Sequence, residues 1–157
     1  MIVSFSLDAW DGALARALGI ASDAGEALDA MIDRYNDVIV MMGFVYYFRS
    51  EPVSWLVAAA ALLGTVAVSY IRGKGAALAV DPVFGCMQRH ERGVWLALAT
   101  VVAPAVAALA EQPSRHPAYY VVVVALAAVA IGTNLTAIRR TQFVVARLEE
   151  RRRTLAA

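Results

Sequence analysis

Apolar residues gather in four stretches along the chain, separated by short polar segments. A helix needs roughly 20 apolar residues to cross a bilayer, and its backbone groups must be hydrogen-bonded within the segment. A further helix over residues 2–18 is too short to cross before its first aspartate. We therefore predict an all-α, polytopic transmembrane bundle of about five helices. The predicted crossing helices cover residues 37–48, with a polar extension back to residue 25, then 53–71, 93–110 and 117–138.

The composition supports a membrane location and narrows the chemistry. Of the 157 residues, 61% are hydrophobic and 17% charged, whereas a soluble domain carries about a quarter charged residues. The net charge is +1 and no basic patch alternates with aromatic residues, so we predict no nucleic-acid partner. Cys86 is the only cysteine, which excludes an internal disulfide and a cysteine-based zinc site. With no repeat or linker, residues 1–157 are predicted to form one domain.

The basic residues predict the orientation, because loops that stay in the cytoplasm are rich in lysine and arginine. Of 14 Lys and Arg residues, 12 fall in segments that the predicted helices place at one membrane face. Only Arg49 and Arg115 fall at the other face. We predict an integral protein of the cell membrane, with the acidic N-terminal part and the C-terminus at the cytoplasmic side. The tail over 139–153 is either a helix lying along an anionic leaflet or a solvated charged segment.

Carboxylates are concentrated where the chain enters the membrane. Seven of the 13 acidic residues lie within the first 37 positions, and carboxylates at membrane depth are usually functional. Asp8 and Asp11 share one helix face, while Asp29 and Asp33 share a face of the next helix. Four converging carboxylates would repel one another unless a cation compensates them, and all-oxygen ligands favour Mg²⁺ or Mn²⁺. We predict that these four aspartates bind two such ions. The other early acidic residues, Asp23, Glu26 and Asp37, are either ordinary helix charges or further members of this site.

Glycine and arginine accompany the aspartates at fixed positions. Gly12 and Gly25 lack side chains where a nucleotide would approach the helix closely, and Arg16 could meet a phosphate. The whole segment reads Asp-x2-Asp-Gly-x2-Ala-Arg-x8-Gly-x3-Asp-x3-Asp over residues 8–33. This series resembles the signature of the CDP-alcohol phosphotransferases. The positions that match it are Asp8, Asp11, Gly12, Ala15, Arg16, Gly25, Asp29 and Asp33.

The resemblance implies a six-helix membrane fold, a homodimer and a cytoplasm-facing active site. It implies that Asp8, Gly12, Ala15, Arg16 and Gly25 contact the nucleotide of a CDP-lipid such as CDP-diacylglycerol. It also implies that three aspartates hold two metal ions and that Asp33 is the general base. That base would take the proton from an acceptor hydroxyl, whose oxygen attacks the β-phosphate so that CMP leaves.

Later segments resemble the branch that makes phosphatidylinositol phosphate or archaetidylinositol phosphate. They are residues 69–74, the spaced series over 85–92, and 134–136 followed by Arg140. In that branch the acceptor is inositol phosphate, and the resemblance implies that Arg72, Arg92 and Arg140 bind its phosphate. The alternative for these arginines is positive-inside topology alone.

Other functions stay open on the sequence alone. The same chemistry could use glycerol phosphate, serine or another alcohol as the acceptor. Intramembrane carboxylates also occur in transporters and proton relays, although those distribute them across the membrane depth. Family members carry an amphipathic helix and a complete first span before the first aspartate, and this chain is expected to lack them. A further alternative is therefore a non-catalytic remnant that acts as a membrane partner.

Overall fold

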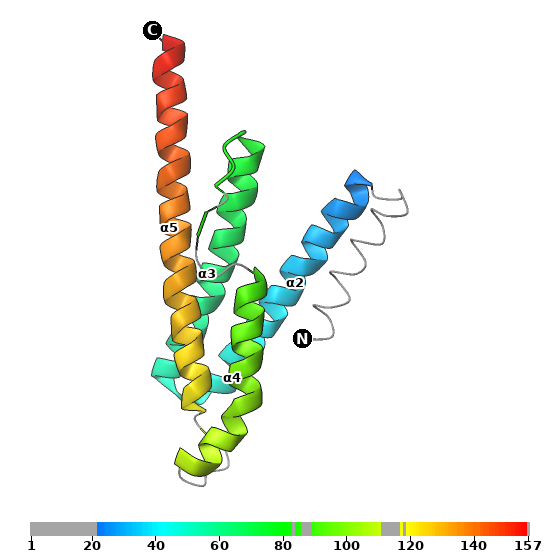
Figure 1. The fold of residues 1–157 in the computed structure, drawn as a ribbon, viewed down its shortest axis with the longest axis vertical. Coiled ribbons are helices and arrows are strands. Elements are labelled where there is room, and N and C mark those ends of the chain that lie inside the picture. Colours follow the sequence, from blue (N-terminus) through cyan, green and yellow to red (C-terminus); the bar gives the residue numbers. More distant parts are fainter. Residues whose placement is uncertain (1–21, 83, 86–88, 111–116, 118, 157) are drawn as a thin grey trace.

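Helices make up nearly all of the computed structural model, which describes residues 22–82, 84–85, 89–110, 117 and 119–156 (Figure 1). No strand occurs in these residues, so the all-α prediction is confirmed for them. The predicted helix over 2–18 lies outside the described residues. The elements in chain order are α2 (Asp23–Tyr47), the 3₁₀ turn η1 (Phe48–Ser50), α3 (Pro52–Ala77), α4 (Arg89–Ala110) and α5 (Tyr120–Ala156).

Local chemistry explains where α2 and α3 begin. The Ser22 hydroxyl accepts a hydrogen bond from the Gly25 backbone N–H at 3.1 Å, which satisfies one of the unpaired donors in the first turn of α2. Pro52 is the first residue of α3, where its fixed φ suits a helix and its missing N–H removes no bond. The predicted start of α3 is therefore confirmed within one residue.

The C-terminal tail continues α5 without a break, so the alternative of a helix lying along the leaflet is wrong (Figure 1). Residues 139–156 contain neither glycine nor proline and consist largely of good helix formers. The pair Arg147 and Glu150 adds an ion pair of 3.2 Å across one turn. At 37 residues α5 is about 55 Å long, much more than the roughly 30 Å hydrocarbon layer, so its C-terminal part extends beyond the membrane.

Three of the four predicted crossing helices are confirmed by length and composition. Within the described residues, α3, the segment Glu91–Leu109 of α4, and α5 are long and apolar enough to cross a membrane, whereas α2 is not among them. Asp37 is the last charged residue of α2, and only ten residues follow it in the helix. Ten residues rise about 15 Å, roughly half of the hydrocarbon thickness. The first predicted crossing, which α2 would make, therefore stays a prediction.

Small residues let α3 and α5 pack closely along most of their lengths. Gly64 of α3 lies against Thr133 and Asn134 of α5. The Asn134 side-chain amide donates to the Ala60 carbonyl of α3 at 2.9 Å, and Thr133 donates within its own helix to the Val129 carbonyl at 2.7 Å. This contact joins two pairs of helices, because α2 packs on α3 and α4 packs on α5.

The connection from α3 to α4 folds back along the bundle, so α4 begins well short of the end of α3 (Figure 1). Val80 donates its backbone N–H to the Gly75 carbonyl at 2.9 Å. A Cβ atom on Gly75 would lie 2.5 Å from the Val80 carbonyl oxygen, so the return requires glycine there. Gly85 has φ +140° and packs against Thr136, which fixes the end of the return on α5.

Candidate active site

The first half of α2 carries the part of the predicted site that the structure describes. Gly25, Asp29 and Asp33 succeed one another at intervals of four residues, so the two carboxylates lie one turn apart on one side of the helix. Asp29 is exposed and Asp33 is half-buried. The other predicted members, Asp8, Asp11, Gly12, Ala15 and Arg16, lie outside the described residues. Convergence of the four aspartates therefore stays a prediction.

The donor chemistry of α2 suits a hard divalent cation. Asp29 and Asp33 offer carboxylate oxygens, the ligands that Mg²⁺ and Mn²⁺ prefer, from adjacent turns of one helix. Within the described part of the chain, no group of three or more His, Cys, Asp or Glu side chains comes together. The two carboxylates of α2 thus fit one half of a metal site, and the predicted remainder would come from Asp8 and Asp11.

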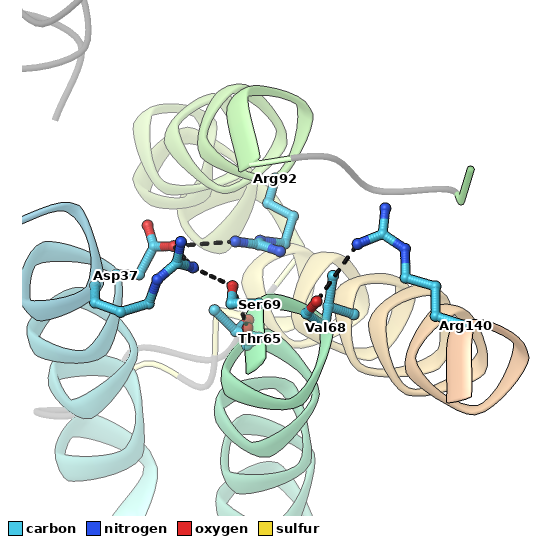
Figure 2. Close-up of polar contacts among 7 residues, drawn as sticks. Asp37, Thr65, Val68, Ser69, Arg92 and Arg140 are labelled. Carbon is cyan, nitrogen blue, oxygen red and sulfur yellow. Dashed lines mark hydrogen bonds and ion pairs between the residues drawn. The ribbon is translucent and has the colours of Figure 1, made fainter. Parts of the chain in front are cut away.

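One turn below Asp33, a polar cluster ties α2 to α3 and α4. The Arg92 Nη2 atom donates to the Asp37 Oδ2 atom at 3.1 Å, and the two side chains are only 5% and 16% exposed (Figure 2). Arg34 Nη1 lies 3.9 Å from the same carboxylate oxygen and donates to the Ser69 hydroxyl of α3. Ser69 in turn donates to the Thr65 carbonyl at 3.0 Å. Asp37 is therefore a paired, largely buried charge and not an ordinary solvated one.

The three arginines predicted to bind a phosphate have different surroundings. Arg72 is exposed near the end of α3, where its charge acts on Arg140. Arg140 is buried and donates through Nε to the Phe84 carbonyl at 2.8 Å, and through Nη1 to the Val68 carbonyl at 3.4 Å (Figure 2). Arg92 is equally buried and points toward Asp37 (Figure 2). Two of the three thus make contacts within the protein, and Arg72 is the accessible one.

A cavity of about 460 Å³ lies between α2 and α3. Its lining residue on α2 is Arg34, which directly follows Asp33 in the sequence. The lining of the cavity is mostly apolar surface, but it includes the basic residues Arg34 on α2 and Lys74 on α3 and the hydroxyl-bearing residues Ser69 and Tyr70. The sequence reasoning had assigned no role to Lys74. A signal was present, however, because the α3 residues that line the cavity recur every three to four positions, the repeat of one helix face. The full lining is Arg34, Val66, Ser69, Tyr70, Gly73 and Lys74.

Comparison with known proteins identifies the family. The family model of the CDP-alcohol phosphatidyltransferases matches residues 1–84, just over half of the chain. The chain belongs to the CDP-alcohol phosphatidyltransferase family. The match contains the complete aspartate signature and the helix faces that line the cavity, whereas Arg92 and Arg140 lie beyond it.

Individual members of the family confirm the predicted resemblance to one branch. The phosphatidylinositol phosphate synthase of Cutibacterium acnes is 38% identical over 88 residues, covering 54% of this chain and 42% of the relative. The archaetidylinositol phosphate synthase of Pyrococcus horikoshii is 34% identical over 102 residues, covering 64% and 53%. The chain thus spans about half the length of the curated relatives it matches.

Solved structures of this family confirm the fold. A phosphatidylinositol phosphate synthase of Mycobacterium tuberculosis, crystallised with CDP-DAG bound, aligns with a TM-score of 0.70 at 23% identity, covering 85% of this chain and 65% of that one. A structure of the same enzyme with manganese and citrate aligns with a TM-score of 0.64 at 24% identity, covering 85% and 62%. The three apolar helices and this fold together make the chain an integral membrane protein.

Proposed function

We propose that this protein transfers a phosphatidyl group from CDP-diacylglycerol to a hydroxyl of inositol phosphate and releases CMP. The observation that carries the proposal is the complete aspartate signature inside the family match, whose second half lies on α2 beside a cavity lined in part by Arg34 and Lys74. The relatives support inositol phosphate as the acceptor, since they are phosphatidylinositol phosphate and archaetidylinositol phosphate synthases.

In the proposed reaction Asp33 is the general base. Its carboxylate takes the proton of the acceptor hydroxyl, and the resulting oxygen attacks the β-phosphorus of the CDP-lipid. The bond from that phosphorus to the oxygen shared with the α-phosphate breaks, and CMP leaves with the bonding electron pair. Two Mg²⁺ or Mn²⁺ ions, held by Asp8, Asp11, Asp29 and Asp33, would when bound stabilise negative charge on the diphosphate.

The nucleotide is proposed to lie against the start of α2 and the preceding segment, at Asp8, Gly12, Ala15, Arg16 and Gly25. Gly25 supports this placement from the described part of the chain. It occupies the first turn of α2, is exposed, and presents no side chain toward a neighbouring molecule. A planar group can approach such a backbone more closely than it could at any other residue type.

The phosphate of the acceptor is proposed to meet the basic residues at this end of α3, α4 and α5. Arg72 and Lys74 are exposed, and Lys74 and Arg34 line the cavity between α2 and α3, so these cations are accessible to a ligand. Arg92 and Arg140 would contact the phosphate only by exchanging their present partners, Asp37 and the carbonyl groups. Arg72 is therefore the first of the predicted arginines to test.

Changing Arg72 to glutamine should raise the KM for inositol phosphate by about 10- to 100-fold, because a hydrogen bond to a charged group contributes about 1.5–3 kcal/mol. The KM for CDP-diacylglycerol should stay within about threefold of the wild-type value, a change of less than 1 kcal/mol. Steady-state CMP release measures both constants. Arg49→Gln is the matched control, since Arg49 is also exposed but lies at the opposite end of the bundle. Equal effects of the two substitutions would contradict the assignment of Arg72.

The topology and assembly are part of the proposal. The excess of basic residues supports an active site and C-terminus on the cytoplasmic side of the cell membrane. The family resemblance supports a homodimer and one catalytic domain over residues 1–157. The transporter alternative is less well supported, because Asp29 and Asp33 both lie in the N-terminal half of α2 and are not spread along the helix.

The direct test is release of CMP by the full-length protein in lipid nanodiscs that contain CDP-diacylglycerol. Inositol phosphate, glycerol phosphate, serine and inositol are supplied in parallel, with Mg²⁺ or Mn²⁺ and with EDTA. We expect CMP with inositol phosphate and its loss with EDTA. Turnover only with another alcohol would establish the second candidate, the same chemistry with a different acceptor. No CMP release with any of the acceptors would favour the alternative of a non-catalytic remnant.

A further inference from the structure

The ion pair of Asp37 and Arg92 joins α2 to α4, whose backbones do not come close to each other in the described residues. Among the described residues, α2 packs on α3 and η1, while α4 packs on α5. The Arg92 side chain reaches from α4 to α2 and donates to the Asp37 Oδ2 atom at 3.1 Å (Figure 2). On the same turn of α2, Arg34 donates to Ser69 of α3. This set of four side chains, the α2 clamp, therefore holds α2 against two other helices at one level.

The clamp lies where the environment of α2 changes. Below it, Met41 is 4% exposed and belongs to the apolar core that also contains Phe48. Above it, Leu28 and Met31 are 63% and 55% exposed, and α2 leans away from α3 toward its N-terminal end (Figure 1). In the described residues, apolar packing thus fixes only the lower half of α2. The position of the upper half, which carries Asp29 and Asp33, depends on the angle at which the helix leaves the clamp.

We propose that Asp37 is a positioning residue that, through Arg92 and together with the contact from Arg34 to Ser69, sets the placement of the α2 carboxylates relative to α3 and α4. The kinetic part of this inference rests on the proposed function, whereas its geometric part does not. Asp37 acts on Asp33 through the helix and is not itself a ligand of substrate.

The chemistry of the clamp suits a positioning role. A guanidinium is planar and directs its donors along fixed lines, so its bond to a carboxylate constrains direction as well as distance. Burial keeps water and salt from weakening the pair, because both side chains are largely shielded. Asp33 lies one helical turn from Asp37, and displacement of a reacting group by about 1 Å can cost about 100-fold in rate. A small change of angle at the clamp is thus sufficient to impair turnover.

The test combines a distance with kinetics. Cys86 is replaced by serine, spin labels are attached at Leu28→Cys on α2 and Ala77→Cys on α3, and the distance distribution is measured by electron paramagnetic resonance. The variants are Asp37→Asn, which removes the charge; Asp37→Glu, which keeps it; and Ser69→Ala, which removes the α3 partner without stranding a buried charge. Glu26→Gln is the matched control, because it removes one acid from the exposed part of α2.

Asp37→Asn should broaden or shift the distance distribution and lower kcat by about 10- to 100-fold. Asp37→Glu should restore both in large part, Ser69→Ala should give a smaller change in the same direction, and Glu26→Gln should match the wild type. An unchanged distance in Asp37→Asn and Ser69→Ala would overturn the inference, as would a rise in acceptor KM alone. If the Asp37→Asn protein does not fold, the distance distribution and kcat of Ser69→Ala decide whether the inference holds. If the wild type releases no CMP, the proposed function fails while the distances still test the clamp.

Discussion

Replacement of Asp33 with asparagine should lower kcat for CMP release by a factor of about 10² to 10⁴, the usual contribution of a positioned general base. The amide keeps the shape of the side chain but accepts no proton at neutral pH. The loss should appear at saturating concentrations of both substrates, because the acceptor hydroxyl must still be deprotonated once it is bound. Single-turnover CMP release in nanodiscs measures the chemical step directly.

Two comparisons separate this loss from damage to the fold. Glu26→Gln removes an acid from the same exposed half of α2 and should keep kcat within about twofold of the wild-type value, since a surface substitution outside the site changes free energies by less than about 0.5 kcal/mol. The thermal unfolding of Asp33→Asn should be followed beside its activity, because Asp33 is half-buried. A well-folded Asp33→Asn protein that retains more than a tenth of the wild-type kcat would contradict the role of Asp33 as base.

The helices could be predicted from the sequence, whereas the C-terminal ends of α3 and α5 could not. Apolar stretches mark only the part of a helix that lies in lipid, so the pattern ended the second predicted crossing at residue 71 and the last at residue 138. The structure continues α3 to Ala77 and α5 to Ala156. The α5 extension remains helical because it contains neither glycine nor proline. The α3 extension ends where the chain makes the tight return at Gly75 and Val80.

In the candidate site, features set by local sequence spacing could be predicted, whereas contacts between distant segments could not. The aspartate signature could be found because its spacing is local, and a helix converts such spacing into one shared face. The partners of Arg92 and Arg140 could not be found, because they lie 55 to 72 residues away in the sequence. Their pairing depends on how four helices pack together. The sequence therefore indicated a basic pocket, while the structure shows two of its arginines in use as internal contacts.

Substitution of Gly64 by alanine should destabilise the bundle by about 1–3 kcal/mol, the usual cost of overpacking a tight core. A Cβ atom there would overlap the Thr133 hydroxyl and lie 2.6 Å from the Asn134 side-chain nitrogen. Neither side chain can yield easily, because Thr133 bonds to the Val129 carbonyl and Asn134 bonds to the Ala60 carbonyl across the helix contact. Relief must therefore come from separation of α3 and α5, which breaks the contact that joins the two helix pairs.

Thermal unfolding in detergent measures this effect, and the expected fall in Tm is about 2–10 °C for a chain of this size. Gly43→Ala is the matched control, because a Cβ atom on Gly43 would meet no heavy atom within 4 Å. Alanine also favours a helix over glycine by about 1 kcal/mol, so the control should unfold at or slightly above the wild-type temperature. The same substitution thus tests close approach at Gly64 and helix propensity alone at Gly43. Equal unfolding temperatures for the two variants would show that α3 and α5 are not in contact at Gly64.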